Sequence, residues 1–255
     1  MSGRPIELFT VSLQGAARLR GHDLRYEGAG LCFGIREDDG ATVTVRTRLA
    51  GDYNVANLLV VTGALRALGL PLSDVAAVLP RLSPVPGRMQ PVPSPDGVPE
   101  GVPLVLVDYA HTPDALEKVL QALRPMALSR GGRLWCVFGC GGNRDATKRP
   151  LMGAIAARLA DAVVVSSDNP RDEPPGLILS QVLAGAERIG GHPAAAVIED
   201  RAEAIAEAVR RAGSADVILI AGKGHEPYQE VAGVKRPFLD AEVAARALAQ
   251  RRPRA

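Results

Sequence analysis

The sequence has few cysteines, few aromatic residues and no long apolar run. Its 255 residues include three cysteines, and aromatic side chains make up only 4%. Three cysteines cannot all pair, and Cys136 and Cys140 lack the further ligands of a zinc site, so we expect a reduced, cytoplasmic protein without a bound metal. No stretch is apolar over the roughly 18 residues that span a bilayer. The opening "MSGRPIELFTVSL" also lacks the basic-then-apolar pattern of a signal peptide.

An excess of charge of either sign is also missing. The chain has 30 basic and 28 acidic residues and a net charge of +2 at pH 7. This balance argues against a general nucleic-acid-binding surface. The composition, 47% hydrophobic and 23% charged, is typical of a soluble globular protein, and the length allows one or two domains.

Two nucleotide-binding motifs are absent or incomplete. The phosphate-cradling motif G-x-x-x-x-G-K-[ST] occurs nowhere in the sequence. The stretch "GCGGNRD" contains Gly139, Gly141 and Gly142, which would let the backbone approach a ligand closely. It falls short of the dinucleotide fingerprint G-x-G-x-x-G.

A proline-rich segment divides the sequence into two parts. Residues 84–103 contain seven prolines, and neither a helix nor a central strand tolerates them. We therefore predict one domain over residues 1–85 and a second over 86–255. In the first, residues 6–13, 24–35 and 41–49 predict a small antiparallel sheet. A helix within 51–70 and a shorter one capped by Ser73 follow.

In the second domain, apolar strands alternate with amphipathic helices. The expected strands are 104–108, 134–139, 162–166, 194–200 and 216–222, and the expected helices begin near Pro113, Lys148, Pro175 and Arg201. This alternation predicts an α/β fold with a Rossmann-like, mostly parallel sheet and helices on both faces. A hairpin over 228–238 and a last helix over 240–250 complete the prediction.

Four polar loops follow strands of this sheet directly. They are "DYAHTPD" (108–114), "GCGGNRD" (139–145), "SDNPRDE" (167–173) and "GKGHEPY" (222–228). Because the carboxyl ends of parallel strands meet at one edge, the loops should lie together, where open α/β sheets bind ligands. The sequence therefore predicts a ligand site at this edge.

The charges in these loops indicate the kind of ligand. Arg144, Arg171 and Lys223 would form an anion-recognising rim, and Asp168 and Glu226 would complement a cation. A ligand with both carboxylate and ammonium groups, such as an amino acid, fits this pattern.

Simpler interpretations stay open for several of these polar residues. Asp108 and His111 could cap the helix that begins at Pro113, and Arg144 could be a solvated loop charge. Asn54, one helical turn before Asn57, could cap its helix or face a nucleotide. Arg88 is a lone cation near the domain junction, where a phosphate could bind.

Six ordered motifs carry a resemblance to a known family. They are "GDYNVANLL", "VPGRMQ", "VDYAHTPDALEKVL", "FGCGGNRDATKRPLMG", "SDNPRDEPP" and "AGKGHEPYQ", and together they closely resemble the Mur ligases. The resemblance implies an amide ligase of peptidoglycan precursor synthesis in the cytoplasm. Such enzymes use ATP and Mg²⁺ to make an acyl phosphate on UDP-N-acetylmuramoyl-L-alanyl-D-glutamate, which the amino group of an incoming amino acid attacks.

The Asp-Asn-Pro-Arg motif is similar to that of the family members that add meso-diaminopimelate rather than lysine. The resemblance implies an amino-acid pocket made by Arg144, Asp168, Asn169, Pro170, Arg171, Gly222 and Glu226. Arg171 would grip the extra carboxylate of diaminopimelate through two charge-assisted hydrogen bonds. The resemblance also places Asn54, Arg88, Asp108 and His111 near ATP.

The sequence departs from the family at its beginning. Family members also carry an N-terminal UDP-sugar domain, a phosphate loop and a carbamylated lysine that helps to hold magnesium, and this sequence begins after all three. Residues 1–85 resemble only the closing part of the central ATPase domain. We therefore expect no catalytic residue in this chain and no ligation by it alone. A hydrophobic outer face over residues 1–50 should favour association.

Two functions of other classes are alternatives. One is a non-catalytic binding module in cell-wall synthesis, which the missing phosphate loop favours. The other is a nicotinamide- or flavin-dependent oxidoreductase, which the predicted fold and the glycine-rich loop favour.

Overall fold

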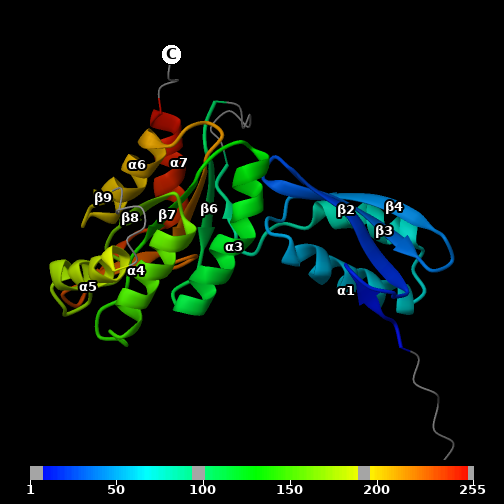
Figure 1. The fold of residues 1–255 in the computed structure, drawn as a ribbon, viewed down its shortest axis with the longest axis horizontal. Helices are drawn as coiled ribbons and strands as arrows, with labels where there is room; N and C mark the ends of the chain where they lie inside the picture. The colour runs from blue at the N-terminus through cyan, green and yellow to red at the C-terminus, as the bar shows by residue number, and fades with distance from the viewer. Residues whose placement is uncertain (1–7, 94–100, 189–195, 252–255) are drawn as a thin grey trace, which may run out of the picture. The chain divides into compact units, whose positions relative to one another are not determined.

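The computed structural model describes residues 8–93, 101–188 and 196–251 (Figure 1). The chain divides into two compact units between Ser83 and Pro84, at the start of the proline-rich segment. None of the helices in these described ranges is long and apolar enough to cross a membrane. The expected strands over 6–13 and 194–200 lie partly outside the described residues.

The first unit contains a four-stranded sheet with two helices and a 3₁₀ turn. Its elements are β1 (Val11–Ser12), β2 (Leu19–Glu27), β3 (Gly30–Glu37), β4 (Thr42–Thr47), α1 (Tyr53–Ala67), α2 (Leu72–Val78) and η1 (Leu79–Arg81). Strands β2, β3 and β4 pair antiparallel, but β1 pairs parallel to β2. The predicted small antiparallel sheet is therefore confirmed for β2, β3 and β4, and β1 departs from it.

Two local predictions in this unit were wrong. The strand expected over residues 24–35 is two strands, because the chain turns at Gly28, whose φ of +60° suits glycine. Ser73 is not the cap of α2, since Pro71 occupies the N-cap position. The hydroxyl of Ser73 instead donates to Asp74.

The apolar face of this sheet is covered. Phe33 and Ile35 of β3 pack with Leu58 and Leu59 of α1 in one buried cluster. The other face of β2–β4 carries exposed polar residues, among them Arg20, Arg36, Thr44 and Arg46. The outer face of β2–β4 is thus more polar than expected, although Leu8, Leu13 and Leu24 are exposed within residues 1–50. Helix α1 also exposes apolar side chains at Tyr53, Val60, Val61 and Leu68, and association through this unit stays a prediction.

The second unit is built on a six-stranded sheet in the order β5-β6-β10-β7-β8-β9. The strands are β5 (Gln90–Pro91), β6 (Leu104–Asp108), β7 (Leu134–Phe138), β8 (Ala162–Val165), β9 (Ala196–Val197) and β10 (Val217–Ala221). Among the described strands of this sheet, β5 alone runs antiparallel, and its edge position tolerates Pro91. The predicted mostly parallel sheet is confirmed.

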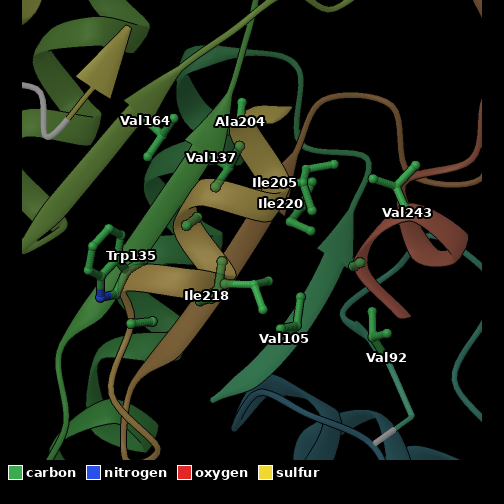
Figure 2. Packing of buried hydrophobic residues seen from close by; sticks show 14 of the residues in the cluster. Val92, Val105, Trp135, Val137, Val164, Ala204, Ile205, Ile218, Ile220 and Val243 are labelled. Carbon is green, nitrogen blue, oxygen red and sulfur yellow. The ribbon is translucent and has the colours of Figure 1, made fainter. Parts of the chain in front are cut away.

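Five helices accompany this sheet, namely α3 (Pro113–Ser129), α4 (Lys148–Leu159), α5 (Pro175–Glu187), α6 (Arg201–Arg211) and α7 (Asp240–Gln250). Figure 2 shows Ile205 of α6 and Val243 of α7 packed over Val105 and Ile220 of the sheet. Burying each such side chain contributes roughly 1.5–3 kcal/mol. This cluster holds no residue of α3, α4 or α5, which contact strands β7, β8 and β10 and therefore cover the other face.

The strand order determines where the polar loops lie. Strand β10, last of the six in sequence, lies between β6 and β7 and pairs parallel to both. The loops after β6, β7, β8 and β10 consequently meet at the carboxyl edge. A hairpin of β11 (Tyr228–Val231) and β12 (Val234–Pro237) follows the last of them.

Candidate functional site

A cavity of about 420 Å³ lies at the carboxyl edge of the sheet of the second unit. All four predicted loops contribute to it. Its lining comprises Tyr109, His111, Thr112, Gly139, Cys140, Gly141, Arg144, Asp145, Lys148, Asp168, Asn169, Arg171, Gly222 and Glu226. The expectation that these loops lie together agrees with this cavity.

Most residues predicted for the amino-acid pocket line the cavity. Arg144, Asp168, Asn169, Arg171, Gly222 and Glu226 do so. Pro170 is buried beside them without lining it.

The residues predicted to face a nucleotide are placed differently. Only His111 lines the cavity. Asn54 belongs to the first unit, where its amide donates to the Ala50 carbonyl at 2.6 Å.

The carboxylate of Asp168 is available to bind a cation. The residue is only 8% exposed, and within the described parts of the chain its carboxylate has no hydrogen bond or ion pair. Burial raises its pKa, while the charges of Arg201 and Lys223 act in the opposite direction. Gly222 makes room for it, since a Cβ there would lie 2.6 Å from the Asp168 Oδ2.

Asn169 holds other site residues in place. Its Nδ2 donates to Glu226 Oε2 at 2.8 Å, and its Oδ1 accepts from the Glu230 backbone N–H at 2.9 Å and from Lys223 Nζ at 3.1 Å. Both lone pairs of Oδ1 are thus used. This amide links the loop after β8 to the loop after β10 and to β11.

Arg171 has a strained backbone that strand β11 supports. Its φ of +53° is uncommon for a residue with a side chain. Its N–H donates to the Glu230 carbonyl at 3.1 Å, and its carbonyl accepts from Ala232 at 2.7 Å. The loop after β8 is therefore paired with the hairpin that follows β10.

The guanidinium of Arg171 is partly committed within the protein. Its Nη1 donates to the Gly142 carbonyl at 2.8 Å, and its Nε lies 3.8 Å from Glu230 Oε2. Nη2 has no hydrogen-bond partner among the residues that the structure describes. The side chain is 22% exposed, so Nη2 is the guanidinium nitrogen that a ligand can reach.

The rim cations differ from the prediction in one respect. Lys223 has no exposed surface and pairs with Glu226 at 3.2 Å, so placing it on an anion-recognising rim was wrong. The lysine that lines the cavity is Lys148, whose Nζ donates to the His111 carbonyl at 2.7 Å. Arg144 is exposed and forms no hydrogen bond or ion pair with the described residues.

Two of the glycines after β7 serve packing between loops. A side chain at Gly139 would clash with the Ser166 carbonyl, and one at Gly142 with the Pro170 carbonyl. These glycines let the loop after β7 lie directly against the loop after β8. Gly139 and Gly141 also line the cavity.

Asp108 and His111 do not cap α3. Thr112 is the N-cap, and its hydroxyl accepts from the Ala115 N–H. Both carboxylate oxygens of Asp108 accept backbone N–H groups at 2.8 Å, one from Met89 and one from Ala110. Burial is the main cause that raises the pKa of Asp108.

An aromatic and cationic cluster lies beside Asp108. The ring of Tyr109 lies 4.7 Å from that of His111, and the guanidinium of Arg88 lies 4.9 Å from the Tyr109 ring centroid. This geometry suits a cation–π contact.

Two buried arginines were not predicted. Arg149 is 1% exposed and binds both oxygens of Glu173 at 2.8 Å, which fastens the loop after β8 onto α4. Arg201 is fully buried and pairs with Asp240. Sequence position contains no signal for either, because an arginine in the first turn of a helix is usually exposed.

The family reaction that the sequence implies uses Mg²⁺, which needs several oxygen ligands close together. The described residues contain no group of three or more His, Cys, Asp or Glu side chains that could hold a metal ion. The described residues therefore do not fit a magnesium site of their own.

The parallel sheet with its cavity at the carboxyl ends of the strands defines a Rossmann-like ligand-binding domain. Residues 87–224 match the family described as "Mur ligase, glutamate ligase domain". The chain belongs to this family. This assignment replaces the oxidoreductase alternative.

Similar proteins extend over nearly the whole chain. It is 54% identical to the UDP-N-acetylmuramoyl-L-alanyl-D-glutamate--2,6-diaminopimelate ligase of Acidovorax sp. (strain JS42), over 98% of this chain and 48% of that protein. The protein of the same name from Pseudomonas aeruginosa is 48% identical, over 95% and 48%. The chain thus spans about half the length of the curated relatives it matches.

A solved structure with the same ligase name covers 94% of this chain and 47% of that one, with a TM-score of 0.73 and 38% identity. UDP-N-acetylmuramate-alanine ligase MurC of Thermotoga maritima shares the fold at 18% identity, with a TM-score of 0.63.

Proposed function

We propose that this chain supplies the amino-acid-binding part of a cytoplasmic ligase that adds meso-diaminopimelate to UDP-N-acetylmuramoyl-L-alanyl-D-glutamate. The names of the relatives support this substrate. So does the cavity, whose lining includes both cationic and anionic side chains. The observation that carries the proposal is that Arg171 lines the same cavity as the carboxylate of Asp168, which has no hydrogen bond or ion pair among the described residues.

The charges of the cavity complement those of diaminopimelate. Asp168 and Glu226 are acceptors for ammonium groups, and Arg144, Arg171 and Lys148 are donors for carboxylates. Diaminopimelate differs from lysine by one carboxylate on its far carbon. Lysine would leave a cation of the site unpaired, which costs roughly 1–3 kcal/mol for a desolvated group.

The proposal assigns binding and orientation to this chain. ATP, when bound by the whole enzyme, would supply the phosphoryl group that activates the acceptor carboxyl. The cavity would hold the incoming amine by its carboxylates and by the second ammonium group. Holding the amine in one orientation favours attack, because it removes orientational freedom before the reaction.

Two further assignments belong to this proposal. Residues 1–85 would be the closing part of a central ATPase domain, which the match to a relative over 98% of the chain supports. Asn54, Arg88, Asp108 and His111 would face the nucleotide. The exposed Arg88–Tyr109–His111 cluster supports this for two of the four, whereas both oxygens of Asp108 are already used by backbone N–H groups.

Isothermal calorimetry with the 255-residue chain tests the proposal. We expect meso-diaminopimelate to bind at least tenfold more tightly than L-lysine, since the two differ by one charge-assisted hydrogen-bonding group. Equal affinity would contradict the proposed substrate. Absence of binding by both, together with capture of a protein partner, would favour a non-catalytic binding module.

A further inference from the structure

Lys223 is a buried cation next to the cavity. Its side chain has 0% exposure, and it does not line the cavity. A buried ammonium group needs close acceptors, because an unpaired buried charge is costly. Lys223 therefore acts on neighbouring protein groups and not on a ligand.

Among the described residues, Asn169, Glu226 and Tyr228 lie close to the ammonium of Lys223. Its Nζ lies 3.1 Å from Asn169 Oδ1 and 3.2 Å from Glu226 Oε2. The ring centroid of Tyr228 lies 5.7 Å away, within the range of a cation–π contact. Two of these neighbours, Asn169 and Glu226, line the cavity.

Of the two carboxylate oxygens of Glu226, one accepts hydrogen bonds from the described residues and the other does not. Its Oε2 accepts from Asn169 Nδ2 at 2.8 Å and from Lys223 Nζ. Its Oε1 has no hydrogen bond to any residue in the described ranges. Two donors on one oxygen fix the carboxylate plane and leave the other oxygen available to the cavity.

We propose that Lys223 is a positioning residue that, together with Asn169, holds the Glu226 carboxylate in the orientation that receives a ligand ammonium group. This inference rests on the proposed function, because it assumes that the ligand carries an ammonium. Lys223 also opposes the rise in the pKa of Asp168 that burial causes.

Lys223→Met tests the role of the cation, with Lys235→Met as the matched control. Lys235 is exposed, and its Nζ lies 4.5 Å from the same Tyr228 ring. Each substitution removes one ammonium beside that ring. We expect Lys223→Met to weaken meso-diaminopimelate binding at least tenfold and Lys235→Met to change it less than twofold. Equal effects would overturn the proposal.

A double-mutant cycle with Glu226→Gln separates positioning from a general structural effect. If Lys223 acts through Glu226, the double variant binds meso-diaminopimelate no more weakly than Glu226→Gln alone. Losses that multiply would show that Lys223 acts independently of Glu226, which would overturn the proposal. If Lys223→Met does not fold, Lys223→Gln, which also removes the cation, enters the same cycle with the same two outcomes.

Ligand-free crystal structures give a readout that does not depend on the substrate. In the chain without the Lys223 cation, Glu226 Oε2 should move beyond hydrogen-bond distance of Asn169 Nδ2. A Glu226 side chain that keeps its orientation would overturn the positioning role. Should the unaltered chain fail to bind diaminopimelate, the proposed function fails, and these structures still decide the role of Lys223.

Discussion

Arg201 and Asp240 form an ion pair in which both side chains are fully buried, with Nε 2.7 Å from Oδ1. The guanidinium also donates to the carbonyls of Ser167 and Ala221. These residues directly precede Asp168 and Gly222, which line the cavity. The pair therefore joins the starts of α6 and α7 to the strand ends that carry the site.

Breaking this pair should destabilise the second unit strongly. Asp240→Asn leaves a buried guanidinium without its counter-charge, and losses of about 3–5 kcal/mol are typical of such changes. Urea unfolding followed by circular dichroism measures the change. The double variant Arg201→Met with Asp240→Leu should recover most of the stability, because it removes both charges. A single variant as stable as the unaltered chain would contradict the account.

The ionised carboxylate of Asp168 should lower the free energy of unfolding at neutral pH. Because burial raises its pKa above the ordinary 3.8, the folded chain binds this proton more tightly than the unfolded chain. Stability therefore falls as pH rises from 3.8 through the raised pKa, and above it the ionised carboxylate opposes folding.

Replacement of this carboxylate should raise the stability of the folded chain and weaken ligand binding. We expect Asp168→Asn to raise the free energy of unfolding by about 1 kcal/mol at pH 7. This corresponds to a rise in Tm of roughly 2–4 °C. Below pH 3.8 this gain in stability should disappear. The same variant should bind meso-diaminopimelate at least tenfold more weakly. Calorimetry at the two pH values, with ligand titration at pH 7, checks both. A lower Tm at pH 7 with unchanged affinity would refute this reading of Asp168.

The contact between the loops after β7 and β8 should not tolerate a side chain at Gly142. A Cβ there would clash with the backbone carbonyl of Pro170, so Gly142→Ala should cost about 1–3 kcal/mol or more through overpacking. Gly176 in α5 is the matched control, since nothing lies within 4 Å of a Cβ there. Gly176→Ala should raise the free energy of unfolding by about 0.4–1 kcal/mol. Similar melting temperatures for the two variants would be evidence against close packing of these loops.

The parallel sheet was predictable because buried parallel strands are continuous apolar runs, such as residues 104–108 and 217–221. Their shared edge follows from parallel pairing, and so does the meeting of the four loops. The position of β10 between β6 and β7 was not predictable, since it depends on contacts between segments more than 80 residues apart.

Most residues predicted for the amino-acid pocket line one cavity, but the direction of each side chain was less predictable. Lys223 and Arg171 both stand in polar, glycine- or proline-containing loops, yet one is buried and the other reaches the cavity. Arg149 and Arg201 escaped prediction because burial of an arginine depends on partners, Glu173 and Asp240, that are 24 and 39 residues away. Local sequence does not reveal such partners.

The most direct test measures how Arg171 changes the preference between two ligands. Calorimetry would give the ratio of the affinities for meso-diaminopimelate and L-lysine in the unaltered chain and in Arg171→Ala. The account predicts that the ratio, at least tenfold at first, falls close to one, because only diaminopimelate carries the carboxylate that the guanidinium would bind. A ratio unchanged by the substitution would contradict the account.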